Sequence, residues 1–232
     1  MTLTEAIDTE VTVDWPDYRS TRLRAPKRPL VPLPERFGDL AGPVFGDDAP
    51  DPADADLTRH GEGEPLGERI IVQGRVLDED GRPIRRALVE VWQANAAGRY
   101  RHEIDQHAAP LDPNFHGAGR CLTDDEGGYR FVTIKPGAYP WANHENAWRP
   151  PHIHFSLFGR AFVQRLVTQM YFPGDPLVEY DPIFHAVREP AARELLVAKF
   201  DLGVTQPEWA LGYTWDVVLG RASPATTPLD PE

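Results

Sequence analysis

Proline and glycine interrupt this chain so often that long helices are excluded from most of its length. The 232 residues include 24 prolines and 19 glycines, and turn signals recur roughly every 10–15 residues from Gly67 onward. The runs between them are rich in β-branched residues, which favour strands. We expect strands at 68–76, 86–95, 119–123, 129–134, 152–158, 163–172 and 214–219. The pattern predicts an all-β sandwich or barrel with one or two short helices, the clearest at Pro190–Phe200.

Residues 1–66 differ from the rest of the chain. Prolines break every helical period there. The region nevertheless contains more aromatic side chains than an ordinary disordered tail, among them Trp15, Phe37 and Phe45. We expect an extended N-terminal arm over 1–66 that wraps a neighbouring part of the molecule or a partner subunit. The folded body is expected over 67–222, and a C-terminal tail follows over 223–232.

The overall charge limits the partners of this protein. The 24 basic and 36 acidic residues leave a formal net charge of −12, which argues against nucleic acid or an anionic membrane as the main partner. An anionic small substrate is still compatible, because one local arginine can outweigh the global field. Cys121 is the only cysteine, so no internal disulfide can form and a reducing cytoplasm is expected. The N-terminus lacks a signal-peptide pattern, and no apolar run approaches the ~18 residues of a membrane span, so a soluble protein is predicted.

The stretch 139–155 gathers residues that can carry chemistry. His152 and His154 lie two positions apart in a predicted strand, so their side chains share one face, with Cα atoms roughly 7 Å apart. Alone, such a pair is more often hydrogen-bonded on a sheet face than bound to a metal. Two prolines after Arg149 stiffen the backbone before the pair, and the two interpretations then become about equally supported.

The other donors of such a metal site are less obvious. Cys121 stands alone, which excludes a structural Cys/His zinc site, whereas Glu145 is compatible by spacing with a ferrous site of two histidines and one carboxylate. Tyr100 and Tyr139 stand where loops meet strands, and each by itself is expected to be a core or rim residue. A tyrosine becomes a phenolate only beside a strong Lewis acid such as ferric iron.

The sequence resembles the intradiol ring-cleaving dioxygenases over about residues 14–219. The resemblance is densest in 88–100, 111–124, 133–141, 148–155 and 168–176, and it includes two tyrosines followed by a His-x-His after Arg-Pro. It implies a β-sandwich with long loops and a catalytic non-haem Fe(III) ion bound by Tyr100, Tyr139, His152 and His154. Two phenolates and a hydroxide then balance the ferric charge, which a buried site strongly favours.

The resemblance also implies a mechanism. A catechol binds as a dianion through both oxygens, Tyr139 leaves the metal and takes up a proton, and O₂ attacks the ring. The ring then opens between the two hydroxylated carbons to give a cis,cis-muconate. Arg149 matches the guanidinium that stabilises charge developing on the ring, although its residue type alone indicates a surface salt bridge.

Further residues match the walls of the substrate pocket in this family. Gln169 matches a pocket residue near the side where O₂ reacts. The alternative is that Gln169 only takes part in pairing two strands. Tyr18, Trp92 and Trp141 match pocket walls or neighbours of the ligands. Trp92 is explained equally well as an ordinary core residue, and Cys121 is expected to be a small buried residue rather than a nucleophile.

The N-terminal arm favours one branch of the family. Relatives that cleave catechol or hydroxyquinol carry a helical N-terminal dimerisation region, whereas this chain has a proline-broken arm. The resemblance therefore favours the branch that cleaves protocatechuate to 3-carboxy-cis,cis-muconate. In that branch a homologous α subunit completes the pocket of the metal-binding β subunit in an (αβ)n assembly. The alternatives are a homomeric enzyme for another catechol and a non-catalytic β-sandwich binding module.

Overall fold

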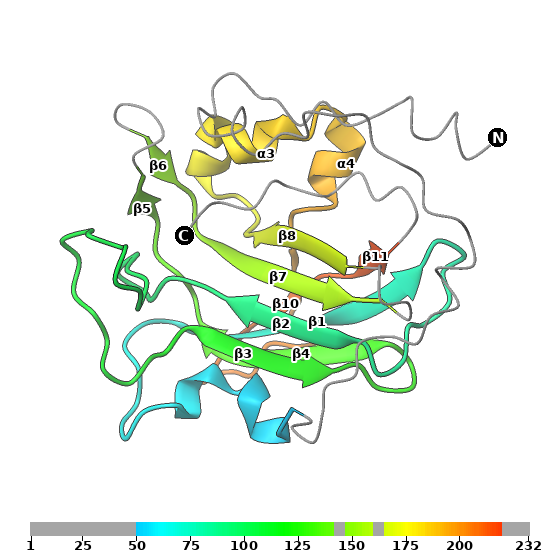
Figure 1. Ribbon diagram of the computed structural model, residues 1–232, viewed down its shortest axis with the longest axis horizontal. Coiled ribbons are helices and arrows are strands. Elements are labelled where there is room, and N and C mark those ends of the chain that lie inside the picture. The colour runs from blue at the N-terminus through cyan, green and yellow to red at the C-terminus, as the bar shows by residue number, and fades with distance from the viewer. Residues whose placement is uncertain (1–49, 142–146, 160–164, 220–232) are drawn as a thin grey trace.

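The computed structural model describes residues 50–141, 147–159 and 165–219, which form a β-sandwich of two sheets with a small hairpin beside it (Figure 1). The first sheet contains β1 (Arg69–Asp78), β4 (Gly128–Ile134), β9 (Lys199–Phe200), β10 (Leu211–Thr214) and β11 (Val217–Leu219). The second sheet has the order β3 (Ala118–Leu122), β2 (Leu88–Trp92), β7 (His152–Phe158) and β8 (Arg165–Tyr171). The hairpin pairs β5 (Tyr139–Pro140) with β6 (Trp148–Arg149). The predicted all-β sandwich is confirmed.

Strand β1 pairs with β4 in antiparallel fashion along one edge and with β10 and then β11, both parallel, along the other. The single strand predicted at 214–219 is wrong, because the chain leaves the ladder at Trp215 and Asp216. The Trp215 carbonyl approaches Gly74 so closely that a Cβ atom there would lie 1.8 Å away. The Asp216 carboxylate accepts a hydrogen bond from the Arg75 amide at 2.8 Å. The break therefore falls where β1 has no side chain to block it.

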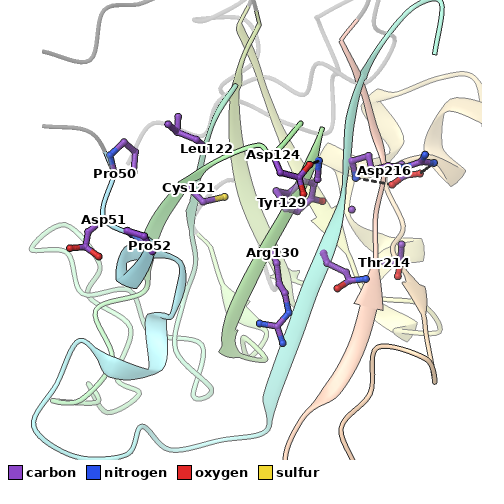
Figure 2. Close-up of a pocket in the computed structure, with 14 residues that line it drawn as sticks. Pro50, Asp51, Pro52, Cys121, Leu122, Asp124, Tyr129, Arg130, Thr214 and Asp216 are labelled. Atoms are coloured by element: carbon purple, nitrogen blue, oxygen red, sulfur yellow. Dashed lines mark hydrogen bonds and ion pairs between the residues drawn. The ribbon is translucent and has the colours of Figure 1, made fainter. Parts of the chain in front are cut away.

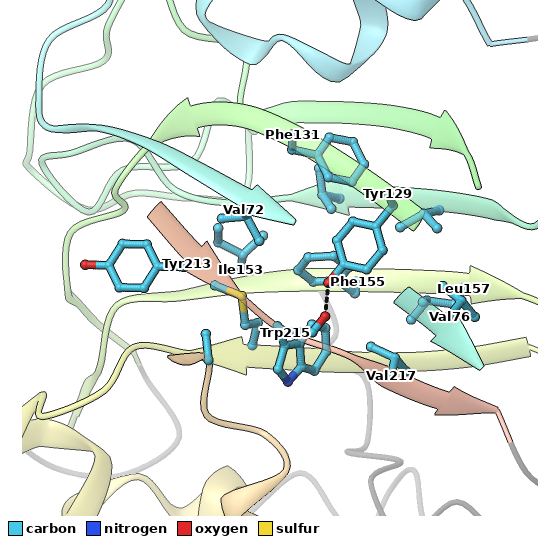
Figure 3. Packing of buried hydrophobic residues seen from close by; sticks show 14 of the residues in the cluster. Val72, Val76, Tyr129, Phe131, Ile153, Phe155, Leu157, Tyr213, Trp215 and Val217 are labelled. Atoms are coloured by element: carbon cyan, nitrogen blue, oxygen red, sulfur yellow. Dashed lines mark hydrogen bonds between the residues drawn. The ribbon is translucent and has the colours of Figure 1, made fainter. Parts of the chain in front are cut away.

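Side chains alternate across β7, and this alternation decides where the candidate site lies. Ile153, Phe155 and Leu157 are at most 2% exposed and point into the space between the sheets (Figure 3). A fully buried side chain of this kind contributes about 1.5–3 kcal/mol to folding. His152 and His154 consequently project from the outer face of the same sheet. Both are nevertheless buried, because other segments cover that face.

Short helices cover the outer face of the second sheet near β8, where Figure 1 labels α3 and α4. They are η4 (Pro176–Tyr180), α3 (Pro182–Ala186) and α4 (Pro190–Glu194). Tyr171, at the end of β8, packs against Val187, Ala192 and Leu196 of this layer. The prediction of one or two short α-helices is therefore confirmed.

The helix predicted over Pro190–Phe200 is too long, because α4 ends at Glu194. Beyond that residue the chain pairs with the end of β8. The Tyr171 amide donates to the Leu196 carbonyl at 2.8 Å, and the Ala198 amide donates to the Tyr171 carbonyl at 2.9 Å. Pairing with a strand from elsewhere in the chain thus overrides a local helical pattern.

The described part of the N-terminal region contains η2 (Pro52–Ala55) and η3 (Leu57–Arg59), which pack against β3 and β4. Leu57 is completely buried and joins the core between the sheets. The rest of the predicted arm and the predicted C-terminal tail lie outside the described residues, so the domain division stays a prediction. No helix within the described ranges is both long and apolar enough to cross a membrane.

Candidate active site

The structure brings the two predicted histidines and the two predicted tyrosines into one cluster near the start of β7. His152 and His154 belong to β7, Tyr139 begins β5, and Tyr100 lies in the loop after β2. The rings of Tyr100 and Tyr139 meet edge to face, with centroids 5.4 Å apart. The Tyr139 ring lies 5.5 Å from that of His152, and the Tyr100 ring lies 6.3 Å from that of His154. Three separate segments therefore converge on the outer face of one sheet.

Ring nitrogens of the two histidines point at the same spot. Nε2 of His152 lies 3.2 Å from Nε2 of His154 and 3.4 Å from the Tyr139 hydroxyl. Nδ1 of His152 donates its proton to the Pro150 carbonyl at 2.8 Å. On a neutral ring Nε2 is then the unprotonated nitrogen, so the Pro150 carbonyl sets the tautomer.

Burial keeps both histidines uncharged. It is the largest of the causes that lower the pKa of His152 well below its usual value, and the nearby Arg149 charge acts in the same direction. The same two causes lower the pKa of His154 to about 3. At neutral pH the cluster therefore offers neutral imidazoles, which is the form that binds metal ions.

A buried asparagine shapes the loop that carries Tyr100. Asn95 accepts hydrogen bonds on its side-chain oxygen from the amides of Ala97 and Arg99, both at 3.0 Å. Its Nδ2 donates to the Pro110 carbonyl at 2.9 Å. One side chain thus satisfies backbone groups on both sides of Tyr100 and fixes the path of the loop.

Two glycines let the two tyrosine-bearing segments meet. The amides of Gly98 and Gly137 both donate to the Asn95 carbonyl, at 3.0 and 2.9 Å. Gly98 has a φ of +77°, and a Cβ atom on it would lie 2.1 Å from the carbonyl oxygen of Ala138. Only a residue without a side chain fits this backbone conformation and this contact. Since Tyr139 follows Ala138 directly, this contact brings the two tyrosines together.

Arg149 lies beside the cluster and is completely buried. Its Nη1 is 3.0 Å from Nε2 of His152 and 3.4 Å from the Tyr139 hydroxyl. Its Nη2 donates to Gln169 Oε1 at 2.5 Å and forms an ion pair with Asp181 at 2.8 Å. The simple expectation of a surface salt bridge is therefore wrong: the ion pair is buried, and the guanidinium contacts the cluster.

Gln169 connects Arg149 to one of the histidines. It stands opposite His154 in the ladder between β7 and β8, and its Nε2 lies 3.4 Å from Nδ1 of His154. Its Oε1 also lies 2.9 Å from the Tyr171 hydroxyl. The contacts of Gln169 therefore go beyond the pairing of two strands.

Sequence reasoning missed two members of this network, Tyr171 and Asp181. The Tyr171 hydroxyl lies 2.9 Å from Asp181 Oδ2, and both side chains are completely buried. The sequence signal for Tyr171 is its position two residues after Gln169, on the same face of the strand. Asp181 precedes Pro182 as an ordinary helix-capping residue does, so its local sequence does not mark it.

Two tryptophans border the cluster. Trp92 stacks on His154 with ring centroids 4.8 Å apart and planes within 4°, which favours a place next to the cluster over an ordinary core position. The guanidinium of Arg149 lies over the Trp141 ring, 5.4 Å from its centroid. Tyr18 and Glu145, which the sequence also suggested, lie outside the described residues.

The donor atoms of the cluster suit a small, hard cation. Two donors bound to one ion at about 2.1 Å and at near right angles lie roughly 3 Å apart. The separations of 3.2 and 3.4 Å around Nε2 of His152 are of this size. Over the described ranges, no group of three or more His, Cys, Asp or Glu side chains is arranged to hold a metal. The oxygen in contact with the histidine pair belongs to Tyr139, a type of donor that suits ferric iron.

A separate groove with a volume of about 820 Å³ lies over β1, β3 and β4 (Figure 2). It is lined by Pro50, Asp51, Pro52, Gln73, Gly74, Arg75, Cys121, Leu122, Asp124, Gly128, Tyr129, Arg130, Thr214 and Asp216, and by none of the predicted site residues. Burial raises the pKa of Cys121 to about 12. Cys121 is half-buried in the wall of this groove. Its thiol is uncharged at neutral pH, as expected for a residue that is not a nucleophile.

Fold and cluster together define the class of β-sandwich dioxygenases. The profile of the Dioxygenase family matches residues 40–221, and that of the protocatechuate 3,4-dioxygenase beta subunit N terminal matches residues 12–36. The chain is 65% identical over 218 residues to the protocatechuate 3,4-dioxygenase beta chain of Burkholderia cepacia, which covers 93% of this chain and 91% of that relative. The chain belongs to the intradiol dioxygenase family, as its sequence resemblance predicts.

More distant relatives are similar to this chain over most of its length. The protocatechuate 3,4-dioxygenase alpha chain of Pseudomonas putida is 33% identical, covering 74% of this chain and 86% of that relative. Hydroxyquinol 1,2-dioxygenase of Rhizobium sp. is 32% identical, and the match covers 69% of this chain and 54% of that relative. Among solved structures, 3-chlorocatechol 1,2-dioxygenase from Rhodococcus opacus 1CP shares the fold, with a TM-score of 0.56 at 24% identity. The match covers 78% of this chain and 70% of that structure. The dioxygenase domain of a Streptomyces dioxygenase–carbohydrate-binding protein fusion has a TM-score of 0.53 at 26% identity. That match covers 77% of this chain and 94% of that structure.

Proposed function

We propose that this chain is the metal-binding β subunit of a non-haem Fe(III) intradiol dioxygenase. Its substrate is protocatechuate, which it cleaves with O₂ to 3-carboxy-cis,cis-muconate. The observation that carries this proposal is the 65% identity to a beta chain with that name. The gathering of two tyrosines and two histidines into one cluster supports it. The folded body over 67–222 is then the catalytic domain, preceded by the N-terminal arm over 1–66.

Tyr100, Tyr139, His152 and His154 would hold the ferric ion. Bound there, the ion would supply Lewis acidity that activates the diol for reaction with O₂. Hard phenolate oxygens stabilise the ferric state. Two phenolates and two neutral imidazoles also keep the net charge of a buried site low, which burial favours.

Residues around the cluster supply the protein's part of the reaction. Tyr139 takes up a proton from the diol at its phenolate oxygen, which lies 3.4 Å from Nη1 of Arg149. Arg149 presents a buried positive charge to the ring, and preorganised charge of this kind is worth roughly 3 kcal/mol in stabilising charge that develops during reaction. Trp92 and Trp141 border the pocket and limit the access of water.

An α subunit completes the pocket in this proposal. The relative at 65% identity is named a beta chain, and an alpha chain is itself similar to this chain. The net charge of −12 repels the carboxylate of protocatechuate, so positive charge must come from Arg149 or from the partner. We place the resulting (αβ)n assembly in the reducing cytoplasm, consistent with a single cysteine in the chain.

Product analysis tests the reaction and the substrate together. The co-expressed αβ enzyme is incubated with protocatechuate and O₂, and the product is identified by mass spectrometry and NMR. The expected product is 3-carboxy-cis,cis-muconate. A yellow semialdehyde indicates cleavage outside the diol and refutes the proposal. Turnover of catechol or hydroxyquinol in preference to protocatechuate supports the alternative in which the enzyme acts on another catechol.

Two further measurements test the metal and the partner. Iron-loaded enzyme should be burgundy, because phenolate-to-iron charge transfer absorbs visible light. A colourless protein with a full complement of iron contradicts phenolate ligation. The chain expressed without an α subunit should be poorly active on protocatechuate, and full activity of the isolated chain contradicts the role of the partner.

A further inference from the structure

The ion pair between Arg149 and Asp181 is buried on both sides. Both side chains are 0% exposed, and Nη2 of Arg149 lies 2.8 Å from Oδ2 of Asp181. Every other ion pair between described residues is partly exposed on both sides. A buried charge that loses its partner is strongly unfavourable, so the guanidinium next to the cluster depends on this carboxylate.

The planar guanidinium transmits the position of Asp181 to the cluster. Because the guanidinium is rigid and flat, fixing one of its ends also fixes the direction of the other. Nη2 is held by Asp181 at 2.8 Å and by Gln169 at 2.5 Å. Nη1, on the other branch, faces Nε2 of His152 at 3.0 Å and the Tyr139 hydroxyl at 3.4 Å. A grip on Nη2 therefore aims Nη1 at the candidate active site.

Asp181 is itself fixed by its neighbours. Its Oδ1 accepts a hydrogen bond from the Ile183 amide at 3.1 Å and so caps α3. Its Oδ2 accepts from the Tyr171 hydroxyl at 2.9 Å as well as from Arg149. Burial, and then the charge of Asp181, raise the pKa of Tyr171 well above its usual value, so this hydroxyl keeps its proton. Each oxygen of the carboxylate thus has a defined partner, and the side chain cannot turn freely.

We propose that Asp181 is a positioning residue for Arg149 in diol cleavage. Its carboxylate holds the guanidinium in the one orientation in which Nη1 faces the reacting diol. Asp181 touches neither histidine nor tyrosine of the ligand set, and it acts through Arg149. This inference rests on the proposed function, because the orientation of Nη1 affects catalysis only when a diol reacts at the cluster.

The Asp181→Asn variant tests this role in the full αβ enzyme. Asparagine keeps the size of the side chain but removes the charge. Its single oxygen can replace only one of the two carboxylate oxygens, so its NH₂ group, a donor, must face either the Ile183 amide or Arg149. Asp175→Asn is the matched control, because Asp175 caps η4 by accepting from the Leu177 amide at 2.9 Å and is only partly buried. We expect kcat/KM for protocatechuate to fall about 100-fold in Asp181→Asn and to change less than about 2-fold in the control.

Iron content and the charge-transfer absorption separate positioning from a structural role. Both should stay unchanged in Asp181→Asn, since its effect is on Arg149 and not on the four donors. Loss of iron in parallel with loss of activity overturns the proposal, and so does an Asp181→Asn variant as active as Asp175→Asn. If the wild-type enzyme cleaves no diol, the proposed function fails and this inference falls with it. If the wild-type enzyme cleaves the diol and Asp181→Asn leaves its activity unchanged, this inference alone fails.

A double-mutant cycle with Arg149→Met keeps the test valid even if Asp181→Asn folds poorly. The double variant contains no unpaired buried charge, so it should regain part of the melting temperature that Asp181→Asn loses, in iron-free as well as iron-loaded enzyme. With Arg149 absent, the Asp181→Asn change should lower kcat by less than about 3-fold, because the residue that Asp181 positions is gone. A further loss of about 100-fold in that background shows that Asp181 acts independently of Arg149 and overturns the proposal.

Discussion

Replacing Gly98 by alanine should separate the two tyrosines, and Gly81 provides a closely matched control. Both glycines have a left-handed backbone, with φ of +77° and +76°, and both amides donate to the carbonyl three residues earlier. A Cβ atom on Gly98 would lie 2.1 Å from the Ala138 carbonyl oxygen, whereas one on Gly81 would meet nothing within 4 Å. The two substitutions therefore share the backbone strain and differ only in the collision between loops.

The difference between the two variants can be worked out from these contacts. Left-handed strain of about 1–2 kcal/mol is partly offset by a gain of about 0.4–1 kcal/mol from a stiffer unfolded chain, so Gly81→Ala should cost about 1 kcal/mol. Gly98→Ala adds an overpacking cost of about 1–3 kcal/mol, for a total of about 3 kcal/mol. At about 2–4 °C per kcal/mol for a chain of this size, the melting temperature should fall by about 6–12 °C for Gly98→Ala and by a few degrees for Gly81→Ala.

Scanning calorimetry and steady-state kinetics on the assembled enzyme check both consequences. A displacement of the Tyr139 segment by about 1 Å can lower the rate about 100-fold, so Gly98→Ala should also lose activity while Gly81→Ala keeps it. Equal melting temperatures for the two variants would refute the argument that the contact with Ala138 requires glycine. Normal activity in Gly98→Ala would refute the link between that contact and the site.

Three further predictions use other residues of the same structure. Asn95→Ala removes three side-chain hydrogen bonds and should lower the free energy of unfolding by about 3 kcal/mol, at roughly 1 kcal/mol each. Urea unfolding should show a much smaller decrease for Asn114→Ala, whose side chain holds an exposed loop. Equal decreases for the two variants would contradict this. Tyr139→Phe should slow substrate binding in stopped-flow measurements while iron content changes little, and wholesale loss of iron would instead make Tyr139 mainly structural. Because the pKa of Cys121 is raised from 9.0 to about 12, its thiolate at pH 8 is about 1,000-fold scarcer in the folded than in the unfolded enzyme. Iodoacetamide should therefore label it far more slowly before unfolding, and similar rates would contradict the raised pKa of its thiol.

The sequence by itself determined the elements whose signal is local. The strand predicted at 152–158 has the same bounds as β7, because alternation along a strand fixes which residues share a face. That alternation already placed His152 and His154 together on one side, and the two prolines before them marked a stiff backbone. The resemblance to a family supplied the two tyrosines, which residue type and spacing alone left as core or rim residues.

Only the tertiary structure decided which segments meet on that face. Tyr100 reaches Tyr139 because Asn95 and two glycines join their loops, and no local pattern specifies a contact between segments so far apart. Arg149 finds Asp181 across 32 positions of sequence, where the carboxylate looks like an ordinary helix cap. The physical reason is the same in both cases. Local sequence sets backbone preference and the direction of side chains, whereas burial makes a charge or a polar group depend on whichever distant partner the fold brings to it.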